Sequence, residues 1–182
     1  IRHFPFGECF DILLQDEHIS FFHSGWGKIA SAGSMQYVIN KYSPHLIVNL
    51  GTCGGFAPEV HQGEIILVEK TYVYDIVELM GDLDIVSYYA SSLDLSWLAE
   101  PYPYPARRGT IASADSDLPP VKIPLLRSQG AIAADWESAA LAWVAQRNNA
   151  RLLILRGVSD MVSEEGGEAY NNIEMFNERA RG

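Results

Sequence analysis

The feature that most constrains this chain is a short aliphatic run that ends in small residues and a carboxylate. Residues 152–155 are all leucine or isoleucine, and a segment containing Gly157 and Ser159 leads from them to Asp160. Continuous aliphatic runs are typical of strands buried on both faces in the parallel sheets of α/β proteins. Ligands bind outside the carboxyl ends of such strands. A carboxylate at that point is therefore placed for chemistry on a small molecule.

Strand and helix patterns alternate along the rest of the chain. Apolar residues at helical spacing predict one helix from Ile29 to Tyr42 and another from Asp135, its N-cap, to Asn148. This alternation predicts a single α/β domain with a mixed central sheet flanked by helices. The further strands are expected at 19–23, 46–50, 65–68 and 109–112.

One stretch does not fit the alternation. Residues 75–105 are rich in tyrosine and proline, and we expect an irregular excursion with a short helix there. Such a segment is suited to a lid or to a subunit contact.

Composition excludes several classes of partner. The net charge of -10 over 182 residues would repel a phosphate backbone, so we expect no nucleic-acid partner. No apolar stretch reaches the roughly 18 residues of a membrane span, and we expect no membrane partner. Two cysteines are too few for a disulfide framework, and the five histidines lack metal-ligand spacing. These features indicate a cytoplasmic protein without a metal or other cofactor.

The candidate site residues also have plainer explanations. Glu137 could favour a helix N-terminus through the macrodipole, and Asp160 could cap the turn that follows it. Thr52 lies among glycines that could simply make a tight turn after the 46–50 strand. Trp136 fits the apolar stripe of its helix.

Five segments, taken in order, resemble the nucleoside phosphorylase/nucleosidase superfamily, and most closely its 5′-methylthioadenosine/S-adenosylhomocysteine nucleosidases. The resemblance extends from about residue 7 to about residue 165, and it implies a nucleoside phosphorylase-like fold. The segments are 24–28, 49–55, 113–115, 135–140 and 158–160.

The resemblance also implies roles for individual residues. Asp160, held by Ser159, would be the general acid that protonates N7 of adenine. Glu137 would accept hydrogen bonds from the ribose hydroxyls, and Trp136 would pack against the ribose. Thr52 would lie near the nucleophile. The segment that flanks the purine would contain Asp117, where the family usually has an apolar residue, and Leu118.

The implied chemistry agrees with these residue types. When an N-glycosidic bond breaks, the ribose becomes positive and the departing base negative. A carboxylic acid beside N7 neutralises the base, and a carboxylate on the hydroxyls orients the sugar and favours the developing cation. Asp160 must be protonated to serve as the acid, so we expect a dry site that raises its pKa.

Two departures from the family pattern leave alternatives open. Phosphorylases of the superfamily have an arginine where this chain has Asn49, which favours water over phosphate as the nucleophile. The glutamate that activates water in the nucleosidases matches neither Glu8 nor Glu17. We therefore expect the domain, residues 1–182, to lack its first strand and this base to lie upstream. A phosphorylase and a non-catalytic nucleoside-binding protein remain alternatives.

The resemblance implies partners as well. The partner of the site would be a small-molecule nucleoside. Family members are homo-oligomers in which a neighbouring chain often closes the pocket, so we expect a homodimer or higher homo-oligomer. The aromatic and proline-rich part of residues 75–105 is the candidate contact.

Overall fold

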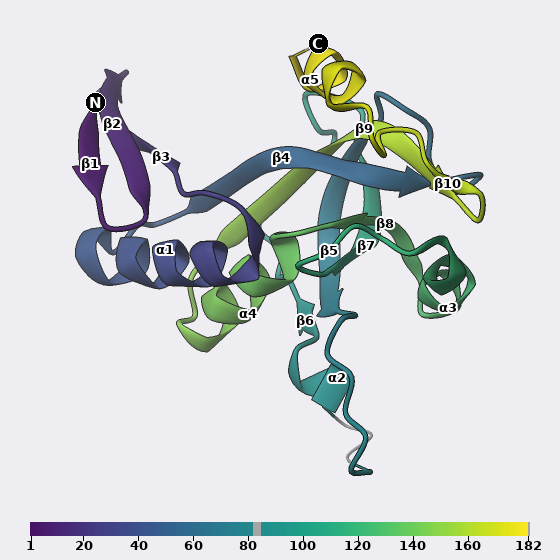
Figure 1. Cartoon of the computed structure of the whole chain (residues 1–182). Helices are drawn as coiled ribbons and strands as arrows, with labels where there is room; N and C mark the ends of the chain where they lie inside the picture. Colours follow the sequence, from purple (N-terminus) through teal and green to yellow (C-terminus); the bar gives the residue numbers. More distant parts are fainter. Residues whose placement is uncertain (82–84, 182) are drawn as a thin grey trace.

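A computed structural model describes residues 1–81 and 85–181 of the chain (Figure 1). The N-terminal part is a three-stranded antiparallel sheet in the order β1-β2-β3. Its strands are β1 (Arg2–Phe4), β2 (Gly7–Leu14) and β3 (Glu17–His23). Aromatic side chains join it to the helix that follows, because Phe4 stacks on Tyr37 with ring centroids 5.5 Å apart.

The remaining strands form a seven-stranded mixed sheet in the order β10-β9-β4-β8-β7-β5-β6. Its strands are β4 (Ile47–Phe56), β5 (Ile65–Val73), β6 (Ser91–Ser92), β7 (Arg107–Ser113), β8 (Ala131–Asp135), β9 (Leu152–Ser163) and β10 (Gly166–Gly167).

The seven-stranded sheet closes on itself. β9 pairs in parallel with β4 along ten residues of β4, and it also pairs antiparallel with β5 through residues 155–157. The circuit β9-β4-β8-β7-β5 therefore returns to β9. This makes β9 the strand that both halves of the sheet share, and Asp160 lies on it.

Helices cover the outside of this ring. α1 (Gly27–Tyr42) and α4 (Ser138–Arg147) lie side by side against one part of the sheet (Figure 1). α3 (Ile123–Ser128), preceded by the 3₁₀ turn Pro120–Lys122, packs near β8. The other two are α2 (Ile85–Tyr88) and α5 (Ile173–Arg181), and α5 packs on β9.

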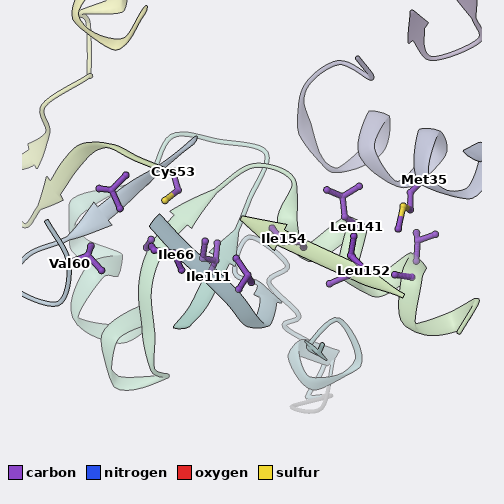
Figure 2. Close-up of a cluster of buried hydrophobic side chains, with 14 residues drawn as sticks. Met35, Cys53, Val60, Ile66, Ile111, Leu141, Leu152 and Ile154 are labelled. Carbon is purple, nitrogen blue, oxygen red and sulfur yellow. The ribbon is translucent and has the colours of Figure 1, made fainter. Parts of the chain in front are cut away.

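Two groups of buried side chains hold these layers together. The larger group, shown in Figure 2, joins Met35 of α1 and Leu141 of α4 to strand residues such as Ile66, Ile111 and Ile154. A second group surrounds Phe56 and packs against α3. The core therefore lies partly inside the ring and partly between the ring and its helices.

The α/β architecture expected from the sequence is confirmed, with three corrections. Residues 51–55 are part of β4 and do not form a turn. Asp160 lies within β9 and does not follow the end of a strand. α4 begins at Ser138, so Glu137 precedes the helix instead of lying in its first turn.

Candidate active site

A β-bulge in β9 gives Asp160 its position. In the pairing with β4, Val158 lies opposite Cys53 and Asp160 opposite Gly54, so Ser159 is skipped. A bulge redirects side chains and breaks their alternation. As a result Val158, Ser159 and Asp160 are consecutive buried residues in a strand that otherwise alternates.

Burial and hydrogen bonds, among them those from the Ser159 hydroxyl and the Ala169 backbone, act on the Asp160 carboxyl. The residue is 6% exposed, and Ser159 Oγ donates to Asp160 Oδ1 at 2.8 Å. Burial raises the pKa of Asp160 above its ordinary value, and the Ser159 hydrogen bond opposes that change. This is the direction that a proton donor requires.

Glu137 stands at the start of α4 with one carboxylate oxygen occupied. Its Oε1 accepts a hydrogen bond of 2.9 Å from the backbone N–H of Gly27. Burial raises the pKa of Glu137, and the Gly27 hydrogen bond opposes it. Gly27 has φ +82, and a Cβ there would lie 2.8 Å from Asp115 Oδ1. Glycine is therefore required where α1 meets Glu137.

Asp135 organises the segment that carries Glu137. Its carboxylate accepts hydrogen bonds from the N–H groups of Glu137 at 3.3 Å and Ser138 at 3.1 Å. Asp135 is thus the last residue of β8, yet its side chain performs the capping expected of it. It also pairs with Arg156 of β9, Nε to Oδ2 at 2.8 Å, with both side chains 2% exposed. This ion pair joins β8 to β9.

The two carboxyl groups belong to one region of the molecule. Gly54 of β4 pairs with Asp160 on one side and with Ala134 on the other. With neighbouring strands about 4.8 Å apart, Asp160 and Ala134 are separated by roughly 10 Å. The segment that follows Ala134 leads through Asp135 to Glu137. The sequence of either segment alone could not predict that they lie close together. In the sheet they are separated only by β4, a strand that is distant from both in the sequence.

The other candidate residues differ in their exposure to solvent. Thr52 is half-buried on β4 opposite Gly157, and Trp136, 37% exposed, lies between Asp135 and Glu137 in the chain. Leu118 is buried, whereas Asp117 is exposed.

Tyr170 is a neighbour that sequence reasoning missed. Its hydroxyl donates to the Leu118 carbonyl at 2.6 Å. Burial raises the pKa of Tyr170 to about 12, and the charges of Asp117 and Asp160 add to the effect. Tyr170 therefore connects the 117–118 segment with Asp160. No sequence signal marked it, because it follows an irregular acidic and glycine-rich stretch.

A second missed cluster lies at the start of α1. Lys28 Nζ pairs with the Asp75 carboxylate, and its backbone N–H donates to Asp115 Oδ1 at 2.7 Å. The Asp115 N–H in turn donates to Asp75 Oδ2 at 2.9 Å. The 24–28 and 113–115 segments were the signals for it, and the contacts explain why they occur together.

Two further observations concern ligands. Within residues 1–81 and 85–181, no three His, Cys, Asp or Glu residues gather as metal ligands would. A surface hollow of about 500 Å³ is lined by residues of the 100–108 segment, including Tyr102 and Tyr104, and none of the candidate residues lines it. The candidate site is therefore defined by the buried side chains around Asp160 and Glu137 and not by that hollow.

The family model described as "Phosphorylase superfamily" matches residues 3–182 of this chain. The chain therefore belongs to the phosphorylase superfamily. This confirms the superfamily that the five sequence segments resemble.

Individual proteins and solved structures indicate which members of the superfamily this chain is similar to. The chain is 26% identical over 181 residues to a 5′-methylthioadenosine/S-adenosylhomocysteine nucleosidase of Anoxybacillus flavithermus, covering 92% of this chain and 77% of that protein. The structure of an Arabidopsis thaliana 5′-methylthioadenosine nucleosidase matches with a TM-score of 0.74 at 20% identity, covering 94% of this chain and 73% of that one. A putative nucleosidase of the same type from Francisella philomiragia matches with a TM-score of 0.79 at 17% identity, covering 99% and 81%. These structural likenesses show the fold.

Proposed function

We propose that this chain hydrolyses the N-glycosidic bond of 5′-methylthioadenosine or a related adenine nucleoside and releases adenine. The observation that carries the proposal is a buried carboxyl with a raised pKa, Asp160, on the bulged strand of a phosphorylase-superfamily fold. The nucleosidase names of the relatives agree with it.

In this proposal Asp160 donates its proton to N7 of the departing adenine. Proton transfer neutralises the charge that develops on the base as the glycosidic bond breaks, and it contributes about 10²- to 10⁴-fold to the rate. The Ser159 hydroxyl donates to Oδ1, which helps to orient the carboxyl group toward the base.

Glu137 anchors the ribose. Since Gly27 occupies Oε1, the second oxygen of Glu137 is available to accept hydrogen bonds from the 2′- and 3′-hydroxyls. A carboxylate on those hydroxyls also stabilises the positive charge of the breaking ribose. Trp136 packs against the sugar, Thr52 lies near the nucleophile, and Asp117 and Leu118 flank the purine.

Charge in the region favours water as the nucleophile. Phosphate binding needs cationic side chains that are free to pair with it. Among the described residues, Arg156 is engaged by Asp135, and Lys28 by Asp75. Asn49, at the position of the phosphorylase arginine, carries no charge. Phosphorolysis is therefore the weaker alternative.

The base that activates water is a further part of the proposal. We place it on a strand upstream of Ile1. Residues 47–52 of β4 pair with β9 along one side only among the described residues, and Val48 and Leu50 are 48% and 68% exposed. An added strand along this edge would cover them.

Assembly and location complete the proposal. We expect a homodimer or higher homo-oligomer in the cytoplasm, with the 75–105 excursion at the contact. Within that excursion Val77, Leu79 and Met80 are 70–95% exposed, as befits residues that a partner would cover. No described helix is long and apolar enough to cross a membrane.

The deciding experiment is chromatographic detection of adenine released from 5′-methylthioadenosine, with and without phosphate. It compares the 182-residue chain with a form of the protein that extends upstream of Ile1. Phosphate-independent release supports hydrolysis, and release from the longer form alone assigns the base to the upstream segment. Release that requires phosphate would identify a phosphorylase. Tight nucleoside binding without release from either form would identify a binding protein.

A further inference from the structure

The C-terminal segment folds back over the strand that carries Asp160. β10 pairs antiparallel with residues 162–163 of β9, and α5 packs on β9 after one further turn. The residue after β10 and a residue of α5 each have a charged side chain that contacts the β9 backbone, and the two form an ion pair.

The members of this pair are Glu168, which follows β10, and Arg179 of α5. Arg179 Nη1 lies 2.6 Å from Glu168 Oε2 and also donates to the Ser159 carbonyl oxygen at 3.5 Å. Glu168 Oε2 accepts the Met161 N–H at 3.3 Å, and the Glu168 N–H donates to the Met161 carbonyl at 3.0 Å. The pair therefore reaches the main chain on both sides of Asp160.

These contacts occur at the bulge, where the regular pairing of β9 with β4 is interrupted. The bulge leaves Ser159 without an opposite residue on β4. An ion pair with side chains 27% and 46% exposed adds little to stability by itself. Because this pair contacts the main chain at the bulge, it can restrain the β9 backbone, which an ordinary surface pair does not do.

We propose that Glu168 and Arg179 are a positioning pair for Asp160, which hold the β9 backbone on both sides of it and so fix the direction of its carboxyl group. The inference rests on the proposed function, in which Asp160 donates a proton to the leaving base. Neither residue touches the base in this proposal, and both act through Asp160.

The charges of the pair support this role. Glu168 raises the pKa of Asp160 and Arg179 lowers it, both less than burial and the Ser159 hydrogen bond do. Two other titratable groups face Asp160, Cys53 from β4 and Tyr170 from the C-terminal segment. Burial raises the pKa of each, so both are neutral near pH 7. The pKa of Glu168 is lowered by its hydrogen bond from Arg179, so Glu168 is charged there.

The test removes the negative charge of the pair in one variant and the positive charge in another. In Glu168→Gln the pKa of Asp160 falls, because a negative neighbour is lost. In Arg179→Gln it rises, because a positive neighbour is lost. Both variants loosen the backbone, so kcat falls about 10- to 100-fold in each while KM changes by less than about threefold. Arg179→Lys, which keeps the charge, retains a pKa of Asp160 near that of the unaltered protein.

Two measurements follow the variants. The alkaline side of the pH profile of kcat reports the active acid, and ¹³C NMR titration of labelled aspartate carboxyls reports Asp160 without any need for turnover. The matched controls are Arg2→Gln and Asp11→Asn, which remove opposite charges from an exposed ion pair between β1 and β2. The controls should leave kcat and the Asp160 titration unchanged.

The outcomes separate the two proposals. Equal-signed shifts of the Asp160 titration in both variants, or no shift together with unchanged kcat, overturn the positioning role. Absence of adenine release from the form that extends upstream of Ile1 overturns the proposed function, and the NMR titration then still decides whether the pair acts on Asp160.

Discussion

At Asp160, burial and the charge of Glu168 oppose the Ser159 hydrogen bond and the charge of Arg179. Burial favours the neutral acid, whereas the Ser159 hydrogen bond and the Arg179 charge favour the carboxylate. The neutral acid is the form that the proposed reaction uses. Turnover should therefore decline as the pH rises through the pKa of Asp160.

Asp160→Asn tests both catalysis and stability. We expect kcat to fall about 10²- to 10⁴-fold with nucleoside binding retained, because the amide cannot donate the proton. The raised pKa means that burial of the neutral acid stabilises the fold at low pH. That stabilisation is lost as the pH rises through the raised pKa. Calorimetry should thus show a higher Tm for the variant than for the unaltered protein at pH 7, and no such advantage near pH 3.

The control for this variant is Asp16→Asn, in the exposed turn between β2 and β3. It should change neither kcat nor the pH dependence of Tm. An Asp160→Asn protein that keeps full turnover would remove Asp160 from the role of acid.

Glu137→Gln tests the ribose anchor. The amide oxygen can still accept the Gly27 N–H, so the fold should be kept, but the charge that favours the ribose cation is gone. We expect kcat/KM to fall about 10- to 100-fold, the range of a hydrogen bond to a charged group. Steady-state kinetics on the nucleoside measures it, with exposed Glu165→Gln as the control. A loss confined to Tm would indicate a purely structural Glu137.

Among the elements, the junction of β8, β9 and α4 depends on the buried ion pair of Arg156. Arg156→Leu leaves Asp135 as a buried carboxylate that keeps only its hydrogen bonds from Ser113 and residues 137–138. The expected loss in the free energy of unfolding is about 3–5 kcal/mol, measured by urea denaturation.

Arg108→Leu provides the comparison, since Arg108 pairs with Glu100 at 3.4 Å on the surface. Removal of that exposed pair should cost much less than removal of the buried one. Similar losses from both substitutions would mean that the buried pair has no special importance.

The elements also show what a sequence pattern can predict. The aliphatic runs of β5 and β7 and the helical spacing of α1 and α4 were sufficient to locate them. The extent of β4 was not predictable, because its glycines are there for close packing. A Cβ at Gly54 would lie 2.7 Å from Val162, and glycine in a pattern otherwise suggests a turn. The alanine-rich β8 has only one β-branched residue, Ile132, and it was missed for that reason.

For the site, sequence reasoning proposed candidate residues but could not predict their arrangement. Asp160 and Glu137 came from motifs, and their chemistry agrees with their burial. The bulge at Ser159 and the contacts of Tyr170, Glu168 and Arg179 come from long-range packing, which no local pattern encodes.

On the scale of the whole molecule, the prediction concerns the second chain that would cover the exposed 75–105 excursion. We expect native mass spectrometry to give about twice the 20.2 kDa mass of one chain. The double substitution Leu79→Glu and Met80→Glu should shift the mass toward one chain, because charges at a buried contact are costly. The same substitutions on exposed Leu13 and Leu14 of β2 are the control. A single-chain mass for the unaltered protein would contradict the homodimer.

The double pairing of β9 has a consequence for synthesis. β4 leaves the ribosome about 100 residues before β9, the strand that it pairs with along its whole length. Until then the ring stays open, and neither Asp160 nor Arg156 has been made. Because such distant contacts form slowly, the half-made chain must wait with the apolar edge of β4 uncovered. A chaperone that shields this edge during translation should therefore raise the yield of folded protein.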